Sequence, residues 1–289
     1  MADTVFDYGA WEEKMIVSQL TGGMGNQMFI YAMGLAQARR LNTSLRLDLT
    51  TAYEGGRLRR PCLELWEGVK NEIVSQAATI GERKATYDQE LVDRITPDSC
   101  LHGYWQTEKY FINVREELLS IFRPKFPFSP YTASLLQQIA QEGRKSAFLS
   151  VRRCEYLTPR NLDLYGQMTM EYYLAACKLV ADNTPDPHFF VFSDDGEWCK
   201  QNFKLPYRFT VVNNCRITHP ITGLGREDEH IWPMRCCHHA IIPNSSFPWW
   251  GAWLSPVPDN DRIVVGPKKW FNNLPADSSD LLPDRWIKL

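Results

Sequence analysis

A glycine-rich turn near the N-terminus has the composition of a phosphate-binding loop. Gly22, Gly23 and Gly25 follow an apolar run, and the polar pair Asn26 and Gln27 comes directly after them. Glycine permits a positive φ or the close approach of another group, and the start of a helix presents free backbone N–H groups to an anion. A tight turn that only packs a helix on a sheet would explain the glycines but not the polar pair. The loop therefore predicts a phosphate-containing ligand.

The same loop partly matches the fingerprint of a dinucleotide-binding fold. Gly23 and Gly25 fit the first two glycines of G-x-G-x-x-G, and Asp48 ends the next apolar run, where an acid that binds ribose belongs. Met28 occupies the place of the third glycine, so the fingerprint is incomplete. An NAD-dependent oxidoreductase is therefore an alternative that this loop raises and that other segments must decide.

Two consecutive arginines supply positive charge at the end of another apolar run. Arg152 and Arg153 follow the segment AFLSV at residues 147–151. Open α/β sheets bind ligands at the carboxyl ends of their strands, and a guanidinium bonds phosphate oxygens in pairs and stays charged. Successive residues face opposite sides, so one arginine can enter a cleft while the other packs elsewhere. The alternative interpretation is a solvated pair that is neutralised by Glu155.

A further strand end carries carboxylates. Ser193, Asp194 and Asp195 close the segment HFFVFSDD, whose first residues are typical of a buried strand. At the carboxyl edge of a sheet, these acids can accept hydrogen bonds from a ribose or a base. Serine and aspartate are also common caps of a following helix, so both interpretations stay open.

The segment IIPNSSFPWWGAWLS combines an apolar run, three polar residues and a helix start. Asn244, Ser245 and Ser246 precede Pro248, a residue that is favoured in the first turn of a helix. Free backbone N–H groups and hydroxyls at such a start form an anion pocket. Tryptophans with helical spacing follow and are expected in the core: Trp249, Trp250 and Trp253.

Strands that alternate with helices are needed to position these side chains. The first half predicts a βαβ unit, with a strand at 14–20, a helix at 26–41 and a second strand at 44–49. A later helix is predicted at 113–122. The proline-rich segment 123–130 is interpreted as a connector. Further strands are predicted at 147–153, 188–195, 208–214, 239–243 and 262–267, with helices at 169–183 and 228–239. The pattern favours two α/β units, residues 1–140 and 141–289, with a cleft where they meet.

Charge and hydropathy exclude several classes of protein. The 289 residues carry a formal net charge of −2, so no broad basic field favours nucleic acid as a partner. No apolar run approaches the ~20 residues of a membrane-spanning helix, and the acidic segment 1–14 lacks the apolar centre of a signal peptide. A complete chain of this kind is expected in the cytoplasm, whereas an ectodomain trimmed of its anchor would be expected in the Golgi lumen.

The eight cysteines are scattered without a C-x-x-C pair, which argues against a disulfide scaffold or a zinc ribbon. The segment CCHH at 236–239 suggests a metal site. Adjacent residues of a helix point in different directions, however, so four ligands in a row cannot close on one ion. We therefore expect no metal in this protein.

Several segments, in the same order along the chain, resemble the α-1,2-fucosyltransferases of glycosyltransferase family 11. GGMGNQMFIYAMG is similar to the family's GGLGNQMFQYA, SVRRCEY to HxRRxDY, and IIPNSSFPWWGAWL to IIANSSFSWWGAWL. The FSDD segment before a tryptophan and the late IVVGPKKWF also resemble segments of that family. Together they span residues 22–271, most of the chain.

The resemblance implies an α/β fold of the GT-B type, in which two Rossmann-like domains face each other across a cleft. Residues 1–140 would form the acceptor-side domain with the glycine loop, and residues 141–289 the domain that binds the donor. The implied activity is inverting, metal-independent transfer of L-fucose from GDP-fucose to a glycan hydroxyl, with an α-1,2 linkage to galactose. A galactose-terminated glycan would be the acceptor, and no cofactor would be needed.

Motif by motif, the resemblance also implies roles for individual residues. The donor diphosphate would be bound by Arg152 and Arg153, with Arg153 the essential residue. The same pocket would be lined by Asn244, Ser245, Ser246 and Phe247, and the guanosine end by Ser193, Asp194 and Asp195. The opposing wall, near the sugar and the acceptor, would be formed by Gly22, Gly23, Gly25, Asn26 and Gln27. The base that takes the proton of the acceptor hydroxyl would be Glu155 or Asp163.

The chain departs from the family pattern at four positions. Ser150 replaces a histidine, Cys154 a glycine and Glu155 an aspartate, and His230 stands where the family has an acid. Serine cannot carry the charge of an imidazole, so these changes bear on the donor and the linkage more than on the fold. Two alternatives stay open: a relative that uses another GDP-deoxysugar, and a pseudoenzyme that kept the fold without the activity.

Overall fold

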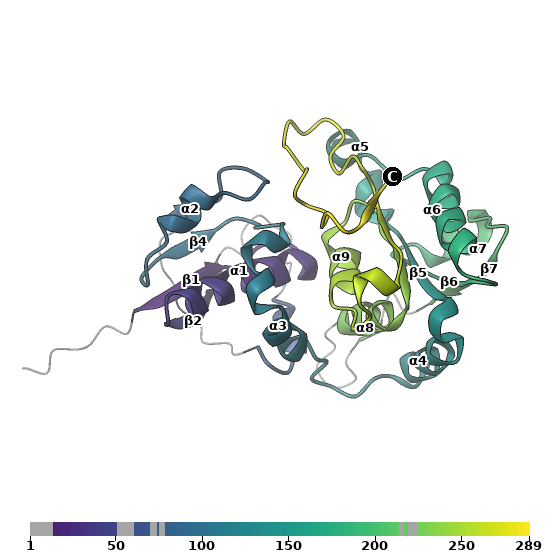
Figure 1. Cartoon of the computed structure of the whole chain (residues 1–289), viewed down its shortest axis with the longest axis horizontal. Helices are drawn as coiled ribbons and strands as arrows, with labels where there is room; N and C mark the ends of the chain where they lie inside the picture. The colour runs from purple at the N-terminus through teal and green to yellow at the C-terminus, as the bar shows by residue number, and fades with distance from the viewer. Residues whose placement is uncertain (1–13, 51–60, 70–73, 75–78, 214–216, 219–224) are drawn as a thin grey trace, which may run out of the picture.

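The chain folds into two lobes, each of which is built on a parallel β-sheet (Figure 1). The structure is a computed structural model, and it describes residues 14–50, 61–69, 74, 79–213, 217–218 and 225–289. The expected α/β fold class is confirmed, because helices connect successive strands in both lobes.

The first lobe holds a four-stranded sheet with the order β2-β1-β4-β3. Its strands are β1 (Met15–Gln19), β2 (Ser44–Asp48), β3 (Ile80–Gly81) and β4 (Cys100–His102), and its helices are α1 (Met24–Arg40), α2 (Gln89–Asp93) and α3 (Arg115–Ile121). The predicted βαβ unit is confirmed, since α1 joins the parallel strands β1 and β2. The helix α1 begins two residues before the predicted start at Asn26, so Gly25 lies in its first turn.

The second lobe holds a six-stranded sheet with the order β10-β9-β8-β5-β6-β7. Its strands are β5 (Ser146–Val151), β6 (His188–Ser193), β7 (Arg208–Val212), β8 (His239–Ile241), β9 (Val264–Gly266) and β10 (Ile287–Lys288). Its helices are α4 (Pro130–Glu142), α5 (Pro159–Tyr165), α6 (Met170–Asn183), α7 (Gly196–Asn202), α8 (Asp228–Cys236) and α9 (Ser246–Trp253). Every strand predicted in this half is present. The division at residues 140 and 141 stays a prediction, and it falls inside α4.

Both faces of the second sheet are covered by helices. Phe189 and Val191 of β6 belong to a cluster with α6, whereas Phe190 and Phe192 belong to the cluster that contains α8 and α9. Alternate residues of β6 therefore point to opposite faces of the sheet, and both faces are buried. This explains why the sequence of the strand is continuously apolar.

The two lobes share one apolar core, which is centred on α1 and α9. The ring of Phe29 in α1 lies 4.5 Å from that of Trp249 and 4.9 Å from that of Trp250, both in α9. Phe111 stacks on Trp250 at 5.5 Å. The prediction that the tryptophans belong to the core is confirmed, because all three in α9 are buried. One continuous apolar core therefore joins the lobes.

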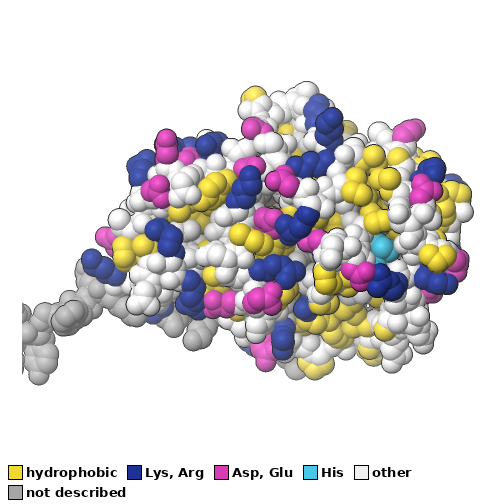
Figure 2. Space-filling model, in the orientation of Figure 1, with side chains coloured by type: hydrophobic (Ala, Val, Ile, Leu, Met, Phe, Trp, Pro, Cys, Tyr) yellow, Lys and Arg dark blue, Asp and Glu magenta, His cyan; other side chains and the backbone are white. Residues whose placement is uncertain are grey.

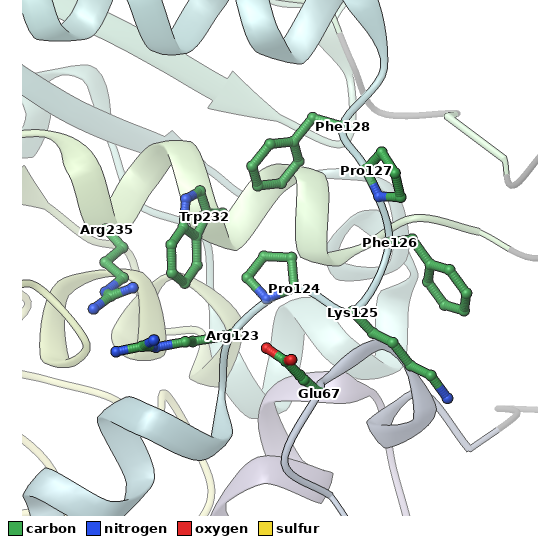
Figure 3. Close-up of a pocket in the computed structure, with 9 residues that line it drawn as sticks. All are labelled: Glu67, Arg123, Pro124, Lys125, Phe126, Pro127, Phe128, Trp232 and Arg235. Carbon is green, nitrogen blue, oxygen red and sulfur yellow. The ribbon is translucent and has the colours of Figure 1, made fainter.

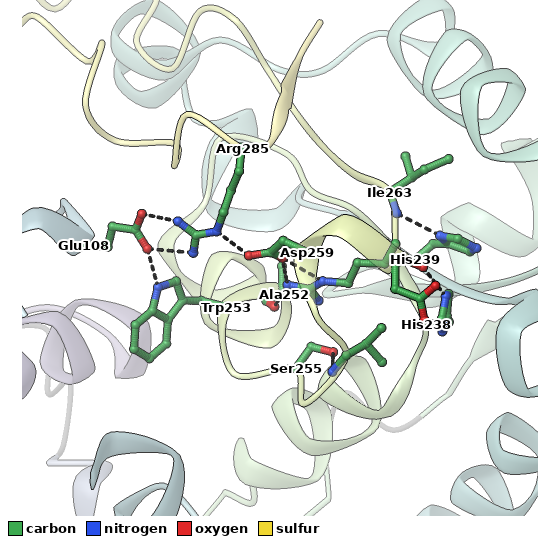
Figure 4. Close-up of polar contacts among 12 residues, drawn as sticks. Glu108, His238, His239, Ala252, Trp253, Ser255, Asp259, Ile263 and Arg285 are labelled. Carbon is green, nitrogen blue, oxygen red and sulfur yellow. Dashed lines mark hydrogen bonds and ion pairs between the residues drawn. The ribbon is translucent and has the colours of Figure 1, made fainter. Parts of the chain in front are cut away.

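A network of charged residues reinforces the same junction (Figure 4). Glu108 of the first lobe accepts a hydrogen bond from Trp253 Nε1 at 2.8 Å and forms an ion pair with Arg285. Arg285 also pairs with Asp259, and Arg262 donates to the carbonyl of Ala252 at 2.8 Å and to Asp259 at 2.6 Å. Because these contacts bind the last residues of α9 to both lobes, they fix the helix at its carboxyl end.

The CCHH segment serves the structure rather than a common centre. Cys237 is buried, His238 Nε2 donates to the carbonyl of Asp261 at 2.7 Å, and His239 Nε2 lies 2.9 Å from the hydroxyl of Thr184. The backbone N–H of Ile263 donates to His239 Nδ1 at 3.0 Å. Within the described part of the chain, no group of three or more His, Cys, Asp or Glu side chains is placed to hold a metal ion.

His239 makes the fold sensitive to acid. Its burial, followed by the neighbouring His238, lowers the pKa of His239 from 6.5 to about 4. Below pH 6.5 the unfolded chain binds this proton while the folded chain does not, so the free energy of unfolding falls as the pH drops toward 4. The expected loss between pH 7 and pH 5 is about 2 kcal/mol. Protonation of Nδ1 would also break the hydrogen bond with Ile263.

Urea denaturation at pH 7 and pH 5 measures this loss. The variant His239→Gln has no imidazole to titrate, so its stability should change less between the two pH values than that of the unmodified chain. An equal change in both proteins would show that His239 does not cause the acid sensitivity.

Candidate active site

The carboxyl edges of the two sheets meet where α1 and α9 begin. The helix α1 starts just after β1 ends, and α9 starts just after β8 ends. The two helix starts touch: Trp250 Nε1 donates to the carbonyl of Gly25 at 2.9 Å, and a Cβ on Gly25 would lie 2.6 Å from the backbone carbon of Ser246. The loops that follow the strands of both sheets therefore converge on one region.

The glycines of the loop have different tasks. Gly22 has a φ of +73°, which favours glycine, whereas Gly25 lets the backbone of α9 approach. Asn26 then bridges the lobes, because its Oδ1 accepts from the hydroxyl of Ser246 at 2.6 Å and from Gln106 Nε2 at 2.8 Å. Two of the three glycines are thus explained, Gly22 by its backbone conformation and Gly25 by the close contact between the lobes.

Gln27 supports the loop from inside. Its side chain is fully buried, donates to the carbonyl of Gly22 at 2.9 Å and accepts from the backbone N–H of Cys62 at 2.8 Å. Of the polar pair that follows the glycines, Asn26 therefore lies at the junction of the lobes, while Gln27 holds the shape of the turn.

Arg153 is held in a fixed position at the end of β5. Its backbone N–H donates to Asp194 Oδ1 at 2.8 Å and its Nε to Asp195 Oδ2 at 3.2 Å. The guanidinium lies 3.5 Å from the ring centre of Trp198, and 13% of the side chain is exposed. A cation that is both stacked and ion-paired keeps its orientation before any ligand arrives.

Arg152 is more exposed and incompletely bonded. Its Nη2 donates to Glu155 Oε2 at 3.0 Å, and its Nη1 lies 2.9 Å from Asp194 Oδ2 in an ion pair without hydrogen-bond geometry. The buried Arg152 Nε has no hydrogen-bond partner among the described residues. A buried donor without a partner is costly, so this N–H is available to an anion.

The acids after β6 divide their roles. The hydroxyl of Ser193 accepts from the backbone N–H of Asp195 at 3.0 Å, and Asp195 Oδ1 accepts from the N–H of Trp198 at 3.2 Å. Asp195 therefore caps α7, which was one of the two interpretations of this segment. Asp194 instead contacts both arginines, so the structure brings these acids and the arginine pair into one cluster.

The start of α9 is not capped by a side chain. Ser245 is the N-cap residue without a side-chain cap, and the backbone N–H groups of Ser246 and Phe247 bond no other described residue. Pro248 is the third helical residue and has no N–H. Free N–H groups at a helix start favour a negative charge in front of them.

Asn244 is buried, and its hydrogen bonds connect neighbouring segments of the second lobe. Its Nδ2 donates to the carbonyls of Tyr165 and Trp270 at 2.7 and 3.0 Å, and its own carbonyl accepts from the hydroxyl of Tyr156 at 2.8 Å. It ties α5 and the loop after β9 to the strand end before α9. Asn244 thus fixes the position of the helix start.

The two acids suggested as bases lie in different surroundings. Glu155 is ion-paired with Arg152 at the edge of the cluster. Asp163 in α5 is exposed, and its Oδ1 accepts from Asn273 Nδ2 at 2.6 Å. The structure therefore brings Glu155, but not Asp163, into contact with the arginine pair.

The surroundings of Asp48 do not fit the alternative of an NAD-dependent oxidoreductase. This residue is buried, its Oδ2 accepts from Gln19 Nε2 at 3.1 Å, and its Oδ1 accepts from the backbone N–H and the hydroxyl of Thr50. Because both carboxylate oxygens are engaged inside the lobe, Asp48 is not available to a ribose.

The sequence patterns did not single out three residues near the strand ends: His102 and Gln19, which end β4 and β1, and Trp198, on which Arg153 stacks. A signal for His102 was present, since a polar residue closes the apolar pair Cys100 and Leu101, as the polar residues do at the other strand ends.

A pocket of about 640 Å³ lies elsewhere, at the connector between the lobes (Figure 3). Arg235 and Trp232 stack in it at 4.1 Å, and Arg235 Nε donates to the carbonyl of Leu254 at 2.7 Å. That carbonyl follows the carboxyl end of α9, so the length of the helix, about 12 Å, separates the pocket from the helix start. The cation caps a helix end there, as helix dipoles favour.

The surface carries no single field of charge on the side shown in Figure 2, where basic and acidic side chains are interspersed. Of the helices in the described residues, none is both long enough and apolar enough to span a bilayer.

The comparison with known proteins decides the family. The sequence model of glycosyl transferase family 11 matches residues 96–288. The chain belongs to glycosyl transferase family 11. It is 28% identical to an α-1,2-colitosyltransferase of Escherichia coli, over 96% of this chain and 99% of that protein. It is 31% identical to the O-antigen biosynthesis glycosyltransferase WbnK of Escherichia coli, over 94% of this chain and 99% of that protein.

Solved structures agree with the fold expected of this family 11 member. The crystal structure of the fucosyltransferase NodZ from Bradyrhizobium superimposes with a TM-score of 0.50 at 14% identity, covering 85% of this chain and 93% of NodZ. The expected GT-B-type fold with two Rossmann-like domains is confirmed. As a member of family 11 with two glycosyltransferases as relatives, the chain is a glycosyltransferase.

Proposed function

We propose that this glycosyltransferase moves L-fucose from GDP-fucose to a hydroxyl of a galactose-terminated glycan, in an α-1,2 linkage, with inversion and without a metal. One observation carries the proposal: the arginine pair Arg152 and Arg153 and the uncapped start of α9 all follow strand ends of one sheet. Cationic guanidinium groups and free N–H groups are what a nucleoside diphosphate requires.

The chemistry of the displacement needs these groups. The acceptor oxygen attacks the anomeric carbon while the bond between that carbon and the β-phosphate oxygen breaks, and the electron pair leaves with GDP. Negative charge grows on the β-phosphate in the transition state. Donors that are already in place, such as the guanidinium of Arg153 stacked on Trp198, stabilise that charge without rearranging. They would supply the positive charge that a divalent cation supplies in other enzymes.

A second donor is favoured by one relative. The colitosyltransferase is similar over nearly its full length, and colitose is fucose without its 3-hydroxyl group. Ser150 in place of the family histidine is compatible with such a change, because it alters β5 two residues before the arginine pair. GDP-colitose is therefore the donor to compare with GDP-fucose.

Calorimetry in buffer with EDTA tests the donor site. We expect GDP to bind with a dissociation constant on the order of micromolar, whereas NAD⁺ should not bind. Incubation with GDP-fucose or GDP-colitose and lactose should then release GDP and form a trisaccharide whose linkage is read by NMR. Binding that requires a metal would contradict the metal-free proposal. GDP binding without turnover of either donor would favour the pseudoenzyme.

A further inference from the structure

His102 ends β4 and is held by a chain of hydrogen bonds that runs into the first sheet. His102 Nδ1 lies 3.1 Å from Gln19 Oε1, and Gln19 Nε2 donates to Asp48 Oδ2 at 3.1 Å. These are the last residues of the neighbouring strands β4, β1 and β2. Gln19 and Asp48 are buried, while His102 is exposed at the carboxyl edge.

The chain of hydrogen bonds fixes the tautomer of the imidazole. A carboxylate only accepts, so Gln19 must turn its NH₂ group toward Asp48 and its Oε1 toward His102. His102 must then donate from Nδ1, which leaves the lone pair on Nε2. Among the described residues, His102 Nε2 has no hydrogen-bond partner. An exposed imidazole with a fixed tautomer and an open nitrogen is equipped to accept a proton.

His102 belongs to the lobe opposite the arginine pair. Four residues after it, Gln106 bonds Asn26, and Asn26 accepts from the hydroxyl of Ser246 at the start of α9. The loop after β4 therefore links His102 to the helix that would hold the donor phosphates, but from the opposite lobe. A base that activates the acceptor belongs there, on the face of the sugar opposite the leaving diphosphate.

We infer that His102 is the general base of the transfer and that Gln19 and Asp48 position it. The inference rests on the proposed function. In the step, Nε2 takes the proton of the acceptor hydroxyl while the acceptor oxygen bonds the anomeric carbon and the GDP oxygen leaves with its electron pair. The imidazolium then returns its proton to water, so no further reactant is needed.

Two acidic residues are connected to His102 through intervening groups. Asp48 acts through Gln19, and Glu82, which follows β3, lies next to the strand of His102: its backbone N–H donates to the carbonyl of His102 at 2.8 Å. Glu82 itself accepts from the N–H groups of Tyr104 and Trp105. Glu82 therefore holds the loop that follows His102 against the end of β3.

The variant His102→Asn tests the inference, because the Asn amide can still donate to Gln19 but offers no base. With GDP-fucose and lactose, we expect kcat to fall about 100-fold, while the acceptor KM and the GDP dissociation constant change less than about twofold. Free imidazole should partly restore His102→Ala. The rise of kcat/KM with pH should be lost in His102→Asn. His188→Asn, at the amino end of β6, should keep its kcat.

The outcomes separate the two ideas. If the unmodified chain binds GDP and transfers sugar, and His102→Asn keeps its kcat or only raises the acceptor KM, the base is elsewhere while the proposed function stands. If lactose is not used, hydrolysis of GDP-fucose, with water as the acceptor, gives the same comparison. If the unmodified chain neither binds GDP nor consumes GDP-fucose or GDP-colitose, both ideas fall.

Discussion

Arg153→Ala is expected to lower kcat/KM for sugar transfer about 10³-fold and to weaken GDP binding in calorimetry. The guanidinium is already fixed by Asp195 and by its stacking on Trp198, so the substitution removes a charge that needs no rearrangement to meet the leaving diphosphate. Arg153→Lys should recover little of the loss, because an ammonium is not planar and lacks the paired donors.

A surface arginine provides the control for this experiment. Arg144 pairs with Asp261 and is 71% exposed, and it lies before the amino end of β5. Arg144→Ala therefore removes the same charge away from the carboxyl ends of the strands and should leave kcat/KM within about twofold. The assignment of Arg153 to the donor phosphates is wrong if its alanine variant, with an unchanged melting temperature, transfers sugar as fast as the Arg144 variant.

Gly25→Ala is expected to reduce the free energy of unfolding by about 3 kcal/mol and to abolish GDP binding. The new Cβ would lie 2.6 to 2.8 Å from three backbone atoms of Ser246 and Phe247, and backbone cannot move aside as a side chain does. The start of α9 must therefore shift away from α1. That shift strains the Trp250–Gly25 hydrogen bond and displaces the free N–H groups of the helix start.

Gly81→Ala is the matched control, since a Cβ on Gly81 meets nothing within 4 Å. Urea denaturation and GDP calorimetry of both variants measure the difference. If Gly25→Ala unfolds at the same urea concentration as Gly81→Ala and binds GDP normally, then the close approach of the two helix starts is not required.

The clusters at strand ends could be predicted from the sequence because they depend only on local patterns. An apolar run that stops at Arg152 or at Asp194 places that residue at the carboxyl edge of any parallel sheet, whatever the order of the strands. The core role of the tryptophans followed in the same way from helical spacing. Even the cap at Asp195 was among the interpretations, since Ser and Asp before a helix are a local signal.

The contacts that join distant segments could not be predicted. The His102–Gln19–Asp48 chain exists because β4 pairs with β1 and β1 with β2, an order that no single segment encodes. Likewise, the sequence around Gly25 indicates only a turn. The structure shows that the backbone of Ser246, 221 positions later, packs against this glycine. The burial of Asn244 also depends on the carbonyls of Tyr165 and Trp270, which come from other elements.

The shared core also sets an order of events during synthesis. Phe29 lies in the first lobe, but its aromatic neighbours Trp249 and Trp250 leave the ribosome some 220 residues later. Until then, the nascent first lobe exposes the apolar side of α1, and contacts of such long sequence separation form slowly. Folding of the first lobe is therefore completed only after α9 has been made, and chaperones have an apolar surface to protect in the interval.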